Sequence, residues 1–302
     1  MSLSSPAQAE AQKPPPKPPP RLAGWTAAGL VSLGALLFPA LWNGFPLVFA
    51  DTGGYLISAV ERSLLIGRSA LYGAFLAAGI AWDFWPNVVA QAAAAAWLIA
   101  LALRAHGLGG RPRRTAAFAL GLALATGLPW SASMLMPDVF ASLAALALHL
   151  LAFRRDALRR AEAIGLVALV AFAVASHMAT LALGAALFVA HLLVRPLAGR
   201  LRLPHPVLAW PALALAAGIA LALFSNLVIA GRLAFTPGGI AFVFGRLVQD
   251  GIVARHLAER CPDPALRLCA YREALPDTAD GWLWGWGSPL YKLGGPDASA
   301  AE

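Results

Sequence analysis

Long apolar runs separated by short polar segments dominate the chain between Leu22 and Ala230. A helix that crosses a membrane needs about 20 mostly apolar residues, although shorter or tilted crossings occur. By this measure the pattern predicts seven crossings. They are expected at Leu22–Trp42, Pro86–Leu103, Thr115–Trp130, Val139–Phe153, Ala163–Ala175, Ala179–Val194 and Pro206–Ala230. The predicted fold class is therefore an all-α, polytopic membrane protein.

One apolar stretch is too long for a single crossing. Ser69–Leu103 runs for 35 residues and is interrupted by "WDFWP" at Trp82–Pro86. A straight helix of this length would overshoot the bilayer, and a charge, a proline and two tryptophans suit a membrane interface. We therefore predict a helix lying at the surface over Ser69–Ala81. The first extracytoplasmic loop, Asn43 to Pro86, is then long, and long loops in compact proteins are usually functional.

Composition agrees with a membrane protein. Hydrophobic residues make up 59% of the 302 residues and charged residues only 13%, with a mean hydropathy of +0.68. The net charge of +8 sits in clusters between apolar runs, which argues against a nucleic-acid partner. The proline-rich residues 1–21 predict a disordered tail that precedes a retained anchor rather than a cleaved signal peptide. Residues 231–302 have the charge density of a soluble segment.

Basic residues predict the orientation of the membrane module, residues 22–230. Four segments that fall on one side hold 14 of the 23 Lys and Arg residues in only 52 residues. They are Met1–Arg21, Arg104–Arg114, Arg154–Glu162 and Arg195–His205. Basic loops stay in the cytoplasm, so the N-terminus is expected there and the C-terminal segment outside. We expect a multi-pass protein, with a bacterial inner membrane as its setting.

Asp51 is the most unusual acidic residue of the predicted module. It follows "FPLVFA" directly, so it lies close to the apolar layer, and two glycines after it allow close approach of a backbone or ligand. The plain alternative is that Asp51 caps a helix beginning at Thr52. Asp83, flanked by tryptophans, has a similar reading as the N-cap of the second crossing.

Other polar side chains are predicted on the same side of the membrane. Asp138, after "MLMP", marks either a re-entry turn or a second carboxylate that helps Asp51 as a base or binds a divalent cation. Arg62 and Arg68 suit a phosphate, since the planar guanidinium donates two hydrogen bonds at once, but they equally suit lipid headgroups. His177 is either a turn residue or a donor to an anionic substrate.

Four motifs together resemble the GT-C class of membrane glycosyltransferases. They are "LWNGFPLVFADTGGYL" at the end of the first crossing, "GRSALYGAFL" after it, the "PWSASMLMPD" turn and the "SH" turn. The resemblance covers about Leu22 to Ala230. It implies a shared module of seven crossings, helices along the membrane in the first outer loop, and a donor sugar on a polyprenyl phosphate or pyrophosphate.

The resemblance also implies roles for single residues. Asp51 matches the loop acid, which acts as a general base on the acceptor or holds the reacting groups; Thr52 stands where many members carry a second acid. "RSALYG", with Arg68 and Tyr72, resembles the part of the loop that approaches the donor phosphate, and Tyr55 is included among the expected substrate contacts. The expected partners are a lipid-linked sugar donor and membrane lipids, and the need for a divalent cation stays open.

The C-terminal segment carries its own motifs. Cys261 and Cys269 would face an oxidising compartment, where a disulfide closing a short loop is expected. Three tryptophans between Trp282 and Trp286 indicate either contact with the membrane and its helices or a surface on which a sugar stacks.

Two other function classes compete with the enzyme. A lipid or polysaccharide transporter would need polar groups deep in the crossings, and these are nearly free of them apart from residues such as His149 and Asn226. A non-catalytic membrane protein would have no need of the long loop with Asp51.

Overall fold

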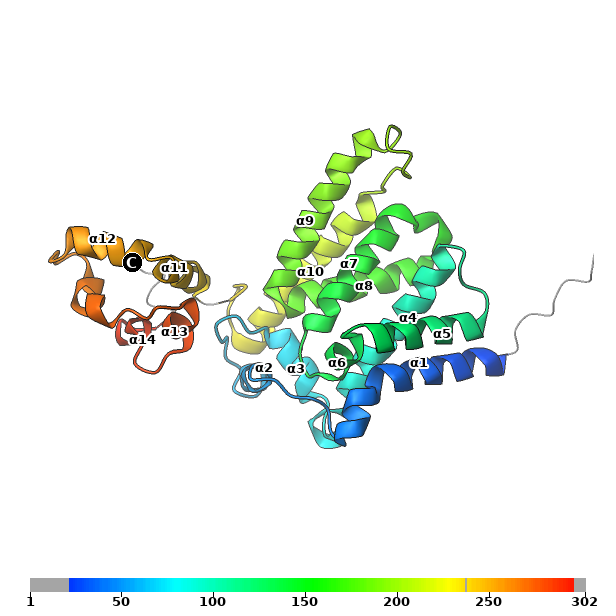
Figure 1. Ribbon diagram of the computed structural model, residues 1–302, viewed down its shortest axis with the longest axis horizontal. Helices are drawn as coiled ribbons and strands as arrows, with labels where there is room; N and C mark the ends of the chain where they lie inside the picture. Colours follow the sequence, from blue (N-terminus) through cyan, green and yellow to red (C-terminus); the bar gives the residue numbers. More distant parts are fainter. Residues whose placement is uncertain (1–21, 237, 296–302) are drawn as a thin grey trace, which may run out of the picture.

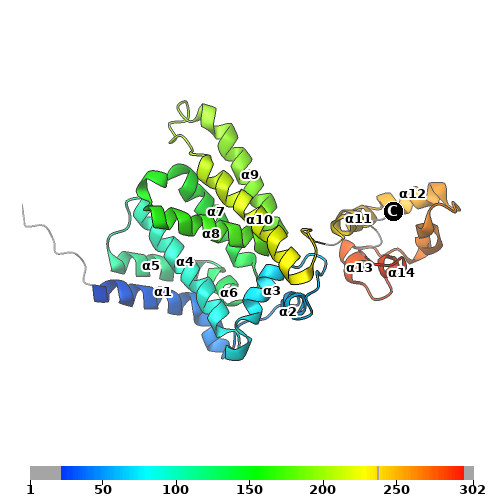
Figure 2. The ribbon, with the colours of Figure 1, turned by 180° about the vertical axis from the view of Figure 1, so that it is seen from behind.

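The computed structural model describes residues 22–236 and 238–295, and within them the secondary structure is helical apart from one isolated bridge. The all-α prediction is confirmed. The predicted disordered tail at 1–21 lies outside the described residues. Figures 1 and 2 show a bundle of long helices with a smaller lobe of short helices at one end.

The bundle contains the long apolar helices and the short ones between them. In chain order these are α1 (Leu22–Asn43), α2 (Thr52–Val60), α3 (Ala70–Ala77), α4 (Trp85–Ala105), α5 (Pro112–Ala125), α6 (Leu128–Ser133), α7 (Asp138–Phe153), α8 (Arg160–Ser176), α9 (Met178–Val194) and α10 (Ala209–Ala230). Short 3-10 turns lie at Ile80–Trp82, Arg155–Ala157 and Arg195–Leu197. The buried faces of these α-helices, apart from α5, form one continuous apolar core.

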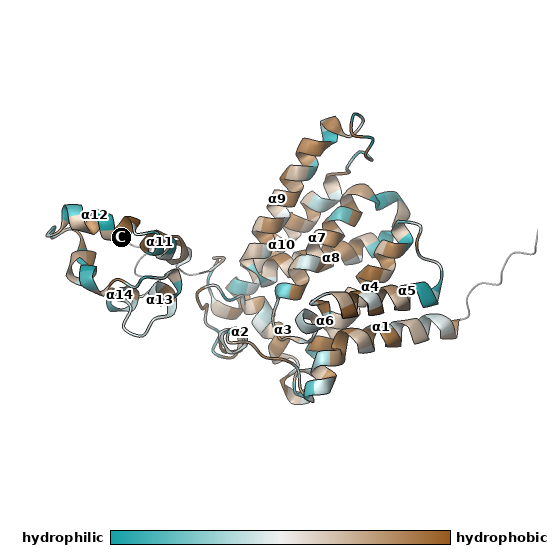
Figure 3. Ribbon diagram, in the orientation of Figure 1, coloured by the Kyte–Doolittle hydropathy of each residue, from teal (hydrophilic) through white to brown (hydrophobic). Residues whose placement is uncertain are grey.

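Four helices in the described part of the chain are long and apolar enough to cross a membrane. They are α1, α4, α9 with the turn after it (Met178–Leu197), and α10. Brown, hydrophobic ribbon covers most of their length in Figure 3. The coarse prediction of a membrane protein therefore stands, whereas α5, α7 and α8 have only 14, 16 and 17 residues.

Two predicted elements differ from the structure. The crossing predicted at Thr115–Trp130 is divided into α5 and α6, because Thr126 is extended and Pro129 lies in the first turn of a new helix. The surface helix predicted at Ser69–Ala81 is only eight residues long, and α3 buries Tyr72 and Leu76 against its neighbours. The prediction of one surface helix over the whole of Ser69–Ala81 was therefore wrong.

The smaller lobe is the C-terminal segment. It comprises α11 (Gly239–Gln249), α12 (Ile252–Arg260), a 3-10 stretch (Arg267–Ala274), α13 (Ala279–Trp284) and α14 (Pro289–Lys292). Trp282, Leu257 and Leu290 are buried in a second apolar cluster, separate from that of the bundle. Cys261 and Cys269 are joined by a disulfide. Ile66 of the first loop belongs to this cluster, so the loop is the point where bundle and lobe meet.

Candidate functional site

The first loop folds onto the segment between α6 and α7. Leu47 N–H donates to the carbonyl of Ser133 at 2.9 Å, and Leu135 N–H donates back to the carbonyl of Leu47 at 2.8 Å. The hydroxyl of Thr52 donates to the carbonyl of Leu135 at 3.1 Å and accepts from Phe49 N–H at 2.9 Å. These bonds hold "FADTGG" beside "MLMPD", two stretches that are predicted to lie on one side of the membrane.

Asp51 occupies the N-cap position of α2, but its side chain does not cap the helix. Its side chain makes no hydrogen bond to the free N–H groups of the helix. It forms an ion pair with Arg68 instead. The helix begins at Thr52, as expected. The capping hydrogen bond considered for Asp51 is not formed, because the carboxylate pairs with Arg68 instead.

Arg68 is the centre of the cluster. Only 15% of its side chain is exposed, compared with 36% for Asp51. Its guanidinium carbon lies 5.6 Å from the centre of the Tyr55 ring and 5.4 Å from that of the Trp284 ring. Both distances are within the range of cation–π attraction. Arg68 is thus held by a carboxylate and by aromatic rings from α2 and from the C-terminal lobe.

Gly54 makes room for this arginine. A Cβ atom at Gly54 would lie 3.3 Å from Nε of Arg68, closer than nearly all real contacts of this kind. A Cβ atom at Gly53 would meet nothing within 4 Å. The two glycines that drew attention in the sequence therefore differ, and the close approach belongs to Gly54.

Tyr55 and Tyr72 form the floor beneath Arg68. They are 1% and 0% exposed, and their rings meet edge to face with centres 5.0 Å apart. Burial raises the pKa of the Tyr55 hydroxyl well above its ordinary value; Arg68 opposes this shift, and Asp138 and Asp51 add to it. Burial also raises the pKa of Tyr72, with smaller contributions from Tyr55 and Asp138. Both hydroxyls stay protonated at neutral pH, which leaves the carboxylates as the bases of this cluster.

A buried glutamine supports the floor. The hydroxyl of Tyr72 donates to Oε1 of Gln91 at 2.9 Å, and Nε2 of Gln91 donates to the carbonyls of Met134 at 2.8 Å and Ala132 at 3.1 Å. Gln91 thereby ties α3 and α4 to the segment before Asp138. Sequence reasoning missed it, although it is the polar side chain that interrupts the "NVVAQAAAAAW" run.

Asp138 is the first residue of α7 and is exposed. A carboxylate at this place is favoured by the partial positive charge of the helix N-terminus. Asp138 contributes to the raised pKa of both Tyr55 and Tyr72, so it lies within electrostatic reach of this cluster. Among the described residues no ion-pair partner faces Asp138. The same residues contain no group of three or more His, Cys, Asp or Glu side chains that could hold a metal ion.

His177 lies behind Arg68 rather than in the open. It occupies the turn between α8 and α9, and both residues line a cavity of about 10 Å³ together with Ser176 and Asn226. Oγ of Ser176 and Oδ1 of Asn226 are buried there without a hydrogen-bond partner. This space is comparable to one water molecule and too small for a phosphate or sugar.

The remaining predicted positions are Arg62, Asp83 and the tryptophans of the C-terminal lobe. Arg62 is exposed after the end of α2, with a left-handed backbone (φ 51°) and no ion-pair partner within the described ranges. Asp83 is not the cap of α4, because Phe84 occupies the cap position and no side chain bonds there. The three tryptophans divide: Trp282 is buried in the lobe, Trp284 lies against Arg68, and Trp286 is fully exposed.

The described geometry is thus a partly buried ion pair on a floor of neutral tyrosines, with a second carboxylate nearby. Comparison of the chain with protein families, curated proteins and solved structures found no match.

Proposed function

We propose that this protein is a membrane glycosyltransferase of the GT-C type, which transfers a sugar from a polyprenyl-phosphate donor to an acceptor outside the cytoplasm. The observation that carries the proposal is the Asp51–Arg68 pair, a base and a phosphate-binding group held together in the long loop at one end of the bundle. The motifs that resemble the GT-C class come together at this place, since the first loop pairs with the segment before Asp138.

The chemistry requires both members of the pair. Asp51 takes the proton of the acceptor hydroxyl while the acceptor oxygen bonds to the anomeric carbon of the sugar. The bond between that carbon and the phosphate oxygen breaks, and the lipid phosphate leaves as an anion that Arg68 stabilises. In the substrate-free pair each group satisfies the other, so a bound phosphate would draw Arg68 away and release the carboxylate.

Asp138 and the neutral tyrosines have supporting roles in this proposal. Asp138 has no cationic partner among the described residues, so it is suited to accept a hydrogen bond from the acceptor and to orient it. Arg62, exposed at the end of α2, is a second cation for a pyrophosphate donor. His177 is reached only when the small cavity behind Arg68 opens.

The finer topology belongs to the same proposal. Seven crossings would be α1, α4, α5 with α6, α7, α8, α9 and α10, with residues 1–21 in the cytoplasm and the C-terminal lobe outside a bacterial inner membrane. Contacts between helix ends support this alternation. Arg104, at the end of α4, pairs with Glu162 near the start of α8, and Ser69 of the first loop donates to the carbonyl of Ala175 at the end of α8. Each contact joins ends that the alternation places on one side.

The test compares transfer of labelled sugar from polyprenyl-phosphate donors by wild type, Asp51→Asn and Arg68→Gln. Loss of a general base typically slows a reaction by about 10²–10⁴-fold, and a loss in this range is expected for Asp51→Asn. Glu61→Gln is the matched control, because Glu61 is an exposed acid of the same loop and should keep its rate. Equal rates for Asp51→Asn and wild type would rule out this role. Substrate flux into vesicles without sugar transfer would favour a transporter.

A further inference from the structure

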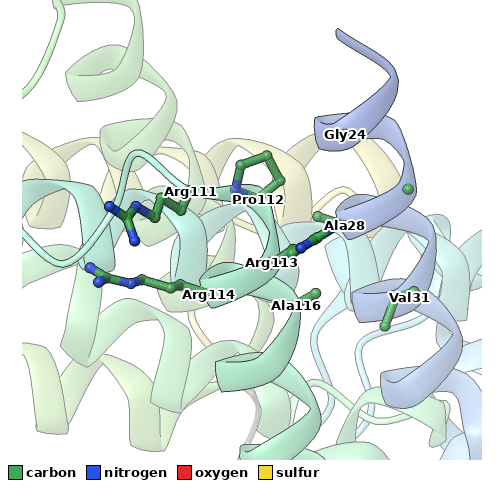
Figure 4. Close-up of a pocket in the computed structure, with 9 residues that line it drawn as sticks. Gly24, Ala28, Val31, Arg111, Pro112, Arg113, Arg114 and Ala116 are labelled. Atoms are coloured by element: carbon green, nitrogen blue, oxygen red, sulfur yellow. The ribbon is translucent and has the colours of Figure 1, made fainter. Parts of the chain in front are cut away.

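A groove of about 740 Å³ lies between the beginnings of α1 and α5, at the end of the bundle away from the C-terminal lobe. Small and apolar residues of α1 form one wall, and three arginines at the start of α5 line the other. Figure 4 shows Arg113 directed toward α1 near Ala28, while Arg111 and Arg114 extend side by side on the other side of α5. The groove therefore combines an apolar wall with the cationic group of Arg113, and Arg111 and Arg114 add positive charge at its edge.

The two helices come close at one point and leave space around it. A Cβ atom at Gly24 would lie 3.4 Å from the ring of Pro112, the first residue of α5. Both helices start at this level and run side by side, as Figures 1 and 2 show. Ala27 and Val31 are exposed along the groove, so its apolar wall is open to a ligand.

The three arginines have unsatisfied charge. Arg111, Arg113 and Arg114 are exposed, and no acidic residue in the described part of the chain pairs with any of them. Like charges repel when they lie side by side, and here the helix N-terminus adds further positive potential. An anion at the start of α5, within reach of Arg113, would be attracted by this positive potential, and phosphate oxygens match the planar guanidinium group.

The level of the groove along the candidate membrane crossing indicates which kind of anion it meets. α1 is a candidate membrane crossing that begins at Leu22, so the arginines lie level with the end of a crossing, where lipid headgroups are found. In Figure 3 the start of α5 is strongly hydrophilic, and α1 changes from pale to hydrophobic ribbon farther along its length. Large apolar side chains farther along both helices are exposed, among them Leu30 and Phe118. A ligand here meets cations at the surface and apolar groups below it.

We propose that this groove binds one anionic phospholipid. Arg113, which reaches toward α1, binds the phosphodiester, Arg111 and Arg114 add positive potential at the start of α5, and the first part of an acyl chain lies along Ala27 and Val31. This site is separate from the Asp51–Arg68 cluster and does not depend on sugar transfer.

The experiment measures lipid binding to the purified full-length protein in neutral detergent by native mass spectrometry, with phosphatidylglycerol and phosphatidylcholine in equal amounts. Wild type should retain phosphatidylglycerol in preference. Replacing Arg111, Arg113 and Arg114 together by Gln should weaken its binding about 10-fold or more. Ala27→Phe should also weaken binding, because it fills the groove without changing the charge.

A second basic segment of the chain provides the matched control. Arg195, Arg200 and Arg202 are also exposed and line none of the cavities described above, so their joint replacement by Gln should leave the preference intact. Equal losses in both triple variants would overturn the proposal in favour of general surface charge. Should the triple variant fail to elute as a single species, Arg113→Gln and Ala27→Phe carry the test. Displacement of the lipid by free glycerol phosphate would overturn it in favour of a simple anion site.

Discussion

Arg68 has more contacts that bear on function than any other residue named in the proposal. It meets Asp51, Tyr55 and Trp284, and Gly54 leaves the space for its side chain. We expect Gly53→Ala to raise the free energy of unfolding by about 0.5–1 kcal/mol, because Gly53 is helical and nothing lies within 4 Å of a new Cβ atom. Gly54→Ala should lack this gain, because Arg68 must shift. Thermal unfolding of the two variants in detergent checks the prediction, and equal gains would contradict it.

The buried tyrosines predict a pH dependence. Burial raises the pKa of Tyr55 in the folded protein above that of the unfolded chain, which is about 10. Both states bind the proton below that value, so the full stability is present there. At higher pH the unfolded state loses its proton first, and the free energy of unfolding falls.

Tyr55→Phe should therefore flatten the loss of stability above about pH 10 while leaving stability at pH 7 nearly unchanged. Tyr72→Phe differs, because it leaves Oε1 of Gln91 buried without its donor and should cost about 1–3 kcal/mol even at pH 7. Unfolding curves of the two variants between pH 7 and 11 distinguish the effects. If the free energy of unfolding of Tyr55→Phe falls with pH as steeply as that of wild type, groups other than Tyr55 cause the loss.

Asp51 and Arg68 were found in the sequence because charges are rare in so apolar a chain. Their ion pair was not predicted, since it joins residues that are 17 positions apart and that only the fold of the loop brings together. A preference for helix capping is local and can be seen in the sequence. Here the carboxylate of Asp51 binds Arg68, which lies against two aromatic rings, instead of the N–H groups of the helix. Gln91 escaped notice because a single amide in a helix gives no sign of its partners.

At the scale of elements, apolar length predicted most helices and local breaks decided where they end. α1, α4 and α10 lie close to the predicted crossings, since each is a continuous run of about 20 apolar residues. Hydropathy did not reveal the break between α5 and α6, where Gly127 and Pro129 are themselves only weakly polar. Helix α3 also ended early, at Ala77, ahead of the 3-10 turn at Ile80–Trp82.

The disulfide of the C-terminal lobe leads to a prediction for that element alone. Cys261 and Cys269 connect the end of α12 to the following 3-10 stretch, eight residues apart. Replacing both by Ser should destabilise the lobe by about 2 kcal/mol, because the unfolded loop regains its freedom. Faster proteolysis within residues 250–290, with the bundle still protected, is the expected result. Unchanged proteolysis would show that the small apolar cluster suffices.

At the scale of the whole molecule, contacts between helix ends divide the bundle into two sides. Gly24 of α1 meets Pro112 of α5, and Val207 before α10 donates to the carbonyl of Ala152 at the end of α7. At the opposite side, Gly67 N–H of the first loop donates to the hydroxyl of Thr236, just after α10. Ends that are near one another in space must share one side of the membrane, which constrains the direction of every helix between them.

These constraints give a labelling prediction for the proposed topology. The native cysteines are joined to each other, so a single introduced thiol supplies the signal in each variant. Val60→Cys and Trp286→Cys, both exposed, should react with a membrane-impermeant reagent in intact cells. Leu108→Cys and Leu201→Cys, also exposed, should react only after the membrane is opened, because the proposed topology puts the arginine-rich loops around them in the cytoplasm. Labelling of Leu108→Cys in intact cells would reverse the orientation, and it would move Asp51 and Arg68 to the cytoplasmic side.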